Sequence, residues 1–205
     1  MHIIFNNTKI DKNLYKTRIF KRGDCIFTAL DECNEVGFIE EGKISISTHT
    51  FSYKEFEINS LGPNSSYGSF LIFSSKPMYL GTAIALKQTK VHIFTKDNLL
   101  KAFEDKQFLN NYLNILADVS LSVQKKVKIL SQGTIEDKIL FILFSNYQET
   151  KSLSIKIKSK ESFARYLCVT RPSLSRELIR LKNNNVLDFN RNSITLNKDY
   201  LLNNM

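Results

Sequence analysis

The chain has 205 residues, of which 42% are hydrophobic and 24% are charged, a composition typical of folded globular proteins and not of disordered or fibrous ones. No segment approaches the roughly 18 consecutive apolar residues that a membrane-spanning helix needs. The net charge of +9 is unevenly divided: residues 1–150 contain 18 Lys or Arg and 16 Asp or Glu, whereas residues 151–205 contain 11 and 4. A region this basic attracts phosphate groups, and a solvated basic surface without a partner is the alternative.

The start of the chain and the cysteines bear on its compartment. Residues 1–7 contain neither a basic leader nor an apolar run of signal-peptide length, so we expect a cytoplasmic protein without a membrane partner. The three cysteines, Cys25, Cys33 and Cys168, are an odd number at spacings that match no zinc motif. We therefore expect free thiols, no disulfide, no metal and no iron–sulfur cluster. A redox role for a cysteine stays open beside the more common role of a small buried hydrophobic residue.

Residues 1–104 have the pattern of a β-roll. Apolar and polar residues alternate in short stretches such as Lys43–Thr48 and Lys90–Phe94, as in half-buried strands. Glycines separate these stretches at the expected turns. We expect this part of the chain to be an all-β roll or barrel.

From about residue 96 the period becomes helical, briefly over 96–103 and then over 105–132. Two apolar stripes run along the long helix. One predicts a dimerisation seam and contains Leu109, Leu113, Leu116, Val123, Val127 and Leu130, with Ser120 between them. The other contains Phe108, Tyr112, Ile115, Val119, Ser122, Lys126 and Ile129 and can pack on the β-roll. The alternative is that both stripes pack within one monomer.

Residues 133–205 are expected to form a third, basic part. Gly133 is the predicted end of the long helix and a candidate hinge, and Thr134 can cap a helix that runs to about Tyr147. Ser154–Lys158 has the pattern of a strand. Ser159 can cap a short helix that starts at Lys160 and ends near Leu167.

A tight turn then leads into a second helix, for which Thr170 is a good N-cap, with Pro172 in the first turn. Its core face contains Leu174, Leu178 and Leu181. Its opposite face contains Arg171, Ser173, Arg176 and Arg180. Two helices joined by such a turn are typical of the helix-turn-helix that places a recognition helix in a major groove. Arginine suits this position because its planar fork can bind guanine or phosphate.

Two short β patterns, 186–189 and 193–196, follow the second helix and predict a hairpin wing with Arg191 at its tip. The basic second helix and the wing together predict a winged helix-turn-helix that binds double-stranded DNA. The residues expected to contact DNA here are Thr170, Arg171, Ser173, Arg176, Arg180 and Arg191. A winged helix that docks a protein partner is the alternative.

Residues 163–167, Phe-Ala-Arg-Tyr-Leu, and 170–178, Thr-Arg-Pro-Ser-Leu-Ser-Arg-Glu-Leu, resemble the helix-turn-helix of the Crp/Fnr family of transcription regulators. The segments around Gly23-Asp24, 38–43 and 61–68 resemble turns of the family's cyclic-nucleotide-type β-roll. The resemblance implies an α+β fold: a jelly-roll-like β-roll that senses or transmits a signal, a long dimerisation helix and a winged helix-turn-helix. It also implies a homodimer on a palindromic operator, with RNA polymerase as a candidate partner.

By this resemblance, Arg171 and Arg176 occupy base-contacting or phosphate-contacting positions, and Ser159 and Lys160 contact the backbone beside the groove. Three residues depart from the family pattern. Cys168 and Asn185 stand where the family usually has glycine, so a left-handed backbone is expected at each. Pro172 stands where members responsive to cyclic AMP have a base-reading glutamate. We therefore expect a different DNA sequence to be recognised.

The segment that matches the family's effector-binding site also departs from the family pattern. Cyclic-nucleotide-binding members supply a glutamate for the ribose and an arginine followed by Ser or Thr for the phosphate. Here the matching positions are Ser69, after Gly68, and the pair Tyr79 and Leu80, so cyclic AMP is not expected to bind. A more apolar ligand and a ligand-free aromatic core are both open, and no cofactor is evident. No catalytic motif is present, so an enzyme is not expected.

Overall fold

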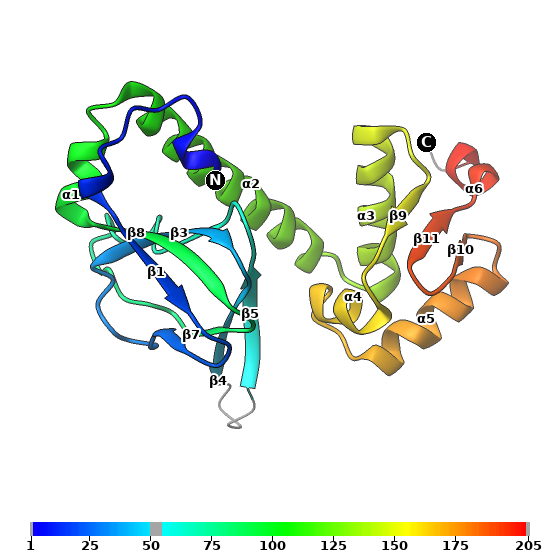
Figure 1. Ribbon diagram of the computed structural model, residues 1–205. Helices are drawn as coiled ribbons and strands as arrows, with labels where there is room; N and C mark the ends of the chain where they lie inside the picture. Colours follow the sequence, from blue (N-terminus) through cyan, green and yellow to red (C-terminus); the bar gives the residue numbers. More distant parts are fainter. Residues whose placement is uncertain (1, 50–54, 204–205) are drawn as a thin grey trace. The chain divides into compact units, whose positions relative to one another are not determined.

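The computed structural model describes residues 2–49 and 55–203, which form two compact units, Met1–Ser120 and Leu121–Met205 (Figure 1). The division between the units lies within the long helix α2 (Lys106–Leu130), whereas the sequence analysis places a boundary at Gly133. None of the helices in the described ranges is long and apolar enough to span a bilayer. We describe each unit by itself.

The first unit is the predicted β-roll, made of two four-stranded antiparallel sheets. One sheet has the order β1-β8-β3-β6 and the other has the order β2-β7-β4-β5 (Figure 1). The strands are β1 (Lys16–Phe20), β2 (Cys25–Phe27), β3 (Glu35–Glu41), β4 (Ile44–His49), β5 (Glu55–Leu61), β6 (Ser66–Tyr67), β7 (Thr82–Ala85) and β8 (Thr89–Thr95). The non-sequential order is that of a jelly-roll-like fold, as the sequence predicts.

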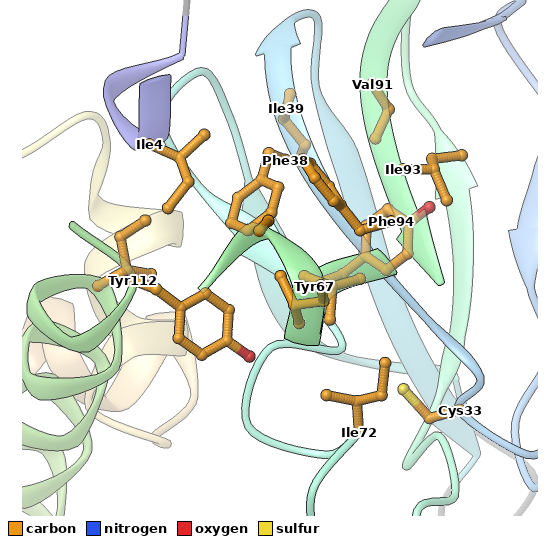
Figure 2. Close-up of a cluster of buried hydrophobic side chains, with 14 of the residues drawn as sticks. Ile4, Cys33, Phe38, Ile39, Tyr67, Ile72, Val91, Ile93, Phe94 and Tyr112 are labelled. Atoms are coloured by element: carbon orange, nitrogen blue, oxygen red, sulfur yellow. The ribbon is translucent and has the colours of Figure 1, made fainter. Parts of the chain in front are cut away.

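The core of the β-roll is aromatic. Phe38 and Phe94 come from the adjacent strands β3 and β8, and their rings meet edge to face at 5.7 Å between centroids (Figure 2). Such pairs add to the hydrophobic stabilisation of their burial. Gly37 has no side chain to place here, and a Cβ at that position would lie 2.1 Å from Tyr67 Cε1. The glycine therefore admits the ring of Tyr67 into the core.

The N-terminal segment, with 3-10 turns η1 (Ile3–Phe5) and η2 (Lys12–Leu14), is part of this core. His2 is fully buried. Its Nδ1 accepts a hydrogen bond from the Ile4 N–H at 3.0 Å, and its Nε2 lies 3.2 Å from the Ser65 carbonyl oxygen, to which it donates. These two partners require the neutral ring with its proton on Nε2.

Helix α1 (Lys96–Ala102) follows β8 and is capped by Thr95, and α2 then packs one face on the β-roll. Phe108, Tyr112 and Ile115 of the second predicted stripe are buried in the core. In the first stripe, Leu113, Val123, Val127 and Leu130 are exposed. Leu109 and Leu116 are half-buried, and Leu116 packs against the β-roll core. The two stripes therefore have different environments, and the monomer leaves most of the seam uncovered.

The second unit contains the predicted winged helix-turn-helix. It consists of α3 (Ile135–Thr150), β9 (Ser154–Lys156), α4 (Lys160–Tyr166), α5 (Arg171–Asn183), β10 (Leu187–Phe189), β11 (Ser193–Leu196) and α6 (Lys198–Asn203). The strands form an antiparallel sheet in the order β10-β11-β9. Thr134, Ser159 and Thr170 each accept the predicted N-cap hydrogen bond. Helix α6 was not predicted, because its six residues are too few for a clear period.

The buried histidine predicts a pH-dependent stability. Burial lowers the pKa of His2 from 6.5 to about 4, so between these values the unfolded chain binds a proton that the folded chain excludes. The unfolding free energy should therefore decrease as the pH falls from 6.5 to 4, by up to about 3 kcal/mol for this group. Urea unfolding at pH 7 and pH 4.5 measures the decrease. His2→Asn should show a smaller decrease than the wild type, and an equal decrease in both would contradict the assignment.

Candidate nucleic-acid interface

The turn between α4 and α5 fixes the angle between the two helices. Cys168 adopts the expected left-handed conformation, with φ of 54°. Its N–H donates to the Arg165 carbonyl at 3.1 Å, and the Val169 N–H donates to the Ala164 carbonyl at 3.0 Å. These bonds close the end of α4 in the manner usual for a glycine. Asn185, the other predicted departure, is also left-handed, with φ of 56°.

Two lysines stabilise the same helix end. Lys126 of α2 donates to the Tyr166 carbonyl, and its ammonium lies 4.3 Å from the centre of the Tyr166 ring. Lys138 of α3 donates to the Leu167 carbonyl at 3.5 Å. Cations are favourable at helix C-termini because the last carbonyls lack partners within the helix. Burial lowers the pKa of Lys126. Lys126 is a charged residue in the predicted second apolar stripe of α2. Its contacts with Tyr166 explain why a lysine stands at this position.

Helix α5 begins at a well-formed cap. The Thr170 hydroxyl accepts from the Ser173 N–H at 3.2 Å and donates to the Ser173 hydroxyl at 2.8 Å. Both residues were predicted to contact DNA, and their hydroxyls are also used in this cap. Leu174, Leu178 and Leu181 are completely buried in the core of the unit. The leucine face therefore sets which side chains of α5 face solvent.

The arginines of α5 fall into two groups. Arg171 and Arg176 are exposed, and no carboxylate of the described residues forms an ion pair with either. Arg180 is held by two carboxylates: its Nη2 lies 2.5 Å from Glu136 Oε2 of α3 and 2.6 Å from Glu177 Oε1. The sequence analysis missed this link because Glu136 and Arg180 are 44 residues apart. Arg180 thus ties α5 to α3, whereas the other two cations are available to a ligand.

A hollow of about 580 Å³ lies between the starts of α4 and α5 and the wing, and Ser159, Lys160, Arg171 and Arg191 are among the residues that line it. Lys160 packs its ammonium 4.2 Å from the centre of the Phe189 ring. Phe189 therefore supports Lys160 from the wing, a contact that the sequence analysis did not include. Ser159 is occupied in its capping box, where its hydroxyl accepts from the Ser162 N–H at 3.1 Å. The hollow is bounded by three cations and one carboxylate, Glu161.

The predicted effector residues do not line one common surface. Ser69 is buried, its carbonyl accepts from the Tyr112 hydroxyl at 2.5 Å, and its hydroxyl accepts from Ser66 at 2.9 Å. Tyr79 is buried and stacks on Phe27 with 3.9 Å between ring centroids. Leu80 points to solvent and is 70% exposed.

Gly68 and Cys33 lie next to each other in the β-roll. Gly68 has φ of 74°, and a Cβ there would lie 2.5 Å from the Glu35 carbonyl oxygen, so a glycine is required. Cys33 is buried beside it, and burial raises the pKa of its thiol. Cys25 and Cys168 are exposed, so the expectation of a buried residue holds for Cys33 and is wrong for Cys25. In the described residues no cluster of three His, Cys, Asp or Glu side chains could hold a metal ion.

Comparison with known proteins agrees with this geometry. Residues 17–106 match the family model of the cyclic nucleotide-binding domain. A structure titled "OCPA complexed CprK" is 20% identical, with a TM-score of 0.71, covering 94% of this chain and 90% of that one. A mutant CooA from Carboxydothermus hydrogenoformans is 16% identical, with a TM-score of 0.70, covering 100% and 95%. No curated protein sequence matches the chain.

A putative transcriptional regulator of the Crp/Fnr family from Eubacterium rectale is 16% identical, with a TM-score of 0.52, covering 98% of this chain and 91% of that one. The chain shares the fold of these structures. At these identities, the likeness establishes the fold of the chain and leaves its ligands to be argued from its own residues.

The ion pairs of Arg180 predict a structural role. Arg180→Ala should lower the thermal unfolding midpoint slightly and weaken DNA binding less than Arg176→Ala does, because the Arg180 guanidinium is already held by two carboxylates. Glu136→Gln is the matched control: it removes the same link between α3 and α5 and keeps every cation. Differential scanning fluorimetry and fluorescence anisotropy measure the two effects. A loss of binding in Arg180→Ala equal to that in Arg176→Ala, with Glu136→Gln unaffected, would show that Arg180 contacts DNA directly.

Proposed function

We propose that the protein is a sequence-specific DNA-binding transcription regulator that binds a palindromic operator as a homodimer. The observation that carries the proposal is the pair of exposed arginines of α5, Arg171 as its first residue and Arg176 on the face opposite its buried leucines. An exposed cation without a carboxylate partner can bond guanine O6 and N7 or a phosphate without first breaking an ion pair. The recognition helices of the two protomers would enter successive major grooves, about one helical turn apart.

The residues around α5 divide into those that would contact phosphates and position the protein on DNA and those that would contact bases. Lys160 and Arg191 flank the hollow beside the start of α5, where a phosphate backbone would pass. Ser159, Thr170 and Ser173 lie at the caps of α4 and α5 and can add hydrogen bonds to phosphates. Arg176, one turn into α5, is our candidate for a base contact. The exposed seam of α2 supports the homodimer, because a long apolar stripe in water is otherwise unfavourable.

The signal that controls such a regulator is not expected to be cyclic AMP. A cyclic phosphate needs a cation or several hydrogen-bond donors, and a ribose needs an acceptor. The Ser69 hydroxyl accepts a hydrogen bond from the Ser66 hydroxyl, and the Tyr79 ring stacks on Phe27. We propose that the aromatic β-roll core either binds a more apolar effector or works without one.

DNA titration tests the proposal. In fluorescence anisotropy at about 0.15 M salt, the ligand-free protein should bind its own upstream DNA more tightly than a scrambled duplex. Arg176→Ala should lose on the order of 1 to 3 kcal/mol on the upstream DNA and relax the base preference, because a base contact is removed. Lys160→Ala should weaken both duplexes similarly and flatten the salt dependence, because a phosphate contact is removed. Equal binding of both duplexes by the wild type, unchanged in either variant, would favour a winged helix that docks a protein.

The exposed seam of α2 predicts the assembly. Val123 is 56% exposed and Val127 is 59% exposed, so a Val123→Glu, Val127→Glu variant should fold normally. It should sediment as a monomer and lose tight operator binding, because two carboxylates cannot be buried in an apolar seam without a large desolvation penalty. We choose these positions over Leu116, because Leu116 packs on the β-roll and its replacement would also disturb the monomer.

Leu121→Glu is the control for the seam. Leu121 lies on the same helix and is 56% exposed, but it is about 120° around the axis from the seam. This variant should sediment as the wild type does. Dimers in the double variant, or monomers in the control, would show that another face of the protein makes the dimer.

A further inference from the structure

The outer face of α5 carries one aliphatic side chain among polar ones. Ile179 lies within α5 and is 53% exposed. It follows Arg176 by three residues and Ser175 by four, so it lies beside both on the next turn. Asn183 lies one turn further along. The apolar side chain of Ile179 is therefore surrounded by polar and charged side chains.

Ile179 is not needed for the core of the second unit. Leu174, Leu178 and Leu181 fill that role and are completely buried. Ile179 is about 100° around the helix from Leu178 and more than 100° from the other two leucines. Pro172 is exposed and lies two turns before Ile179, nearly on the same line along the helix. Pro172 and Ile179 thus form an apolar line along the exposed side of α5, and Arg176 lies beside it.

The charges around this line indicate its partner. Arg176 lies beside Ile179 on the exposed side of α5, and Arg171, Lys160 and Arg191 lie around the start of the helix. This arrangement favours a polyanion over a hydrophobic protein surface, which would have to bury these cations. The major groove offers one apolar group to a side chain, the C5-methyl of thymine. A β-branched residue with a restricted rotamer suits such a contact, because little side-chain entropy is lost on binding.

We propose that Ile179 is a specificity-determining residue that recognises the C5-methyl group of a thymine in each operator half-site. The inference rests on the proposed function. Ile179 lies about 4.5 Å along the helix from Arg176, so the thymine should lie within about two base pairs of the group that Arg176 contacts. Together they would select a thymine close to a guanine.

A selection followed by removal of single methyl groups tests the proposal. The wild type is used to enrich sequences from a random duplex library, and each thymine of the enriched site is then replaced by deoxyuridine. Deoxyuridine keeps every hydrogen-bonding group of thymine and lacks only the methyl. At one thymine per half-site, the replacement should weaken wild-type binding about fourfold, as expected for one buried methyl group. Ile179→Ala should bind the unmodified site about as weakly and be insensitive to that replacement.

Two further variants sharpen the result. Ile179→Val keeps a β-branched apolar contact and should keep the sensitivity to deoxyuridine. Leu202→Ala removes an aliphatic side chain of similar exposure, 66%, from α6 and should behave as the wild type does. An enriched site at which Ile179→Ala is as sensitive to deoxyuridine as the wild type would overturn the inference and leave the proposed function standing. A library from which the wild type enriches no sequence would overturn both.

Discussion

Burial of one face of α5 determines what the second unit can do. Leu174, Leu178 and Leu181 fill the core, and this fixes the rotation of the helix about its axis. The opposite face, with Arg176 and Ile179, must then point to solvent. The cap at Thr170 and the left-handed Cys168 fix where the helix begins. Hydrophobic burial, which has no direction of its own, thus orients the cations, because a helix with one apolar face packs in one way.

Burial of apolar side chains also orients the long helix α2, once in each unit. Phe108 and Tyr112 bury one stripe in the aromatic β-roll, and Ile129 is buried in the core of the second unit. The seam with Val123 and Val127 remains in water. The Tyr112 hydroxyl also donates a hydrogen bond to the Ser69 carbonyl. This bond joins α2 to the segment between β6 and β7.

The core of the β-roll is filled by its own aromatic side chains. Ser69 is buried beside it and hydrogen-bonded to Ser66. Tyr67 lies against Gly37, and Tyr79 stacks on Phe27. Burial and neighbouring charges raise the pKa of both tyrosine hydroxyls, so they remain neutral. The rings stabilise the roll by filling its interior.

The sequence by itself determined the elements whose causes are local. The period of 3.6 gave α2 and α5, the alternation gave the strands, and Thr134, Ser159 and Thr170 marked helix starts because caps act over three residues. It also separated the two stripes of α2. Only the tertiary structure decided which cations are free: Arg180 is held by Glu136, and Lys160 is supported by Phe189. Those pairs join residues far apart in the chain, and the burial of His2 likewise depends on Ser65, because such contacts arise only when the elements pack.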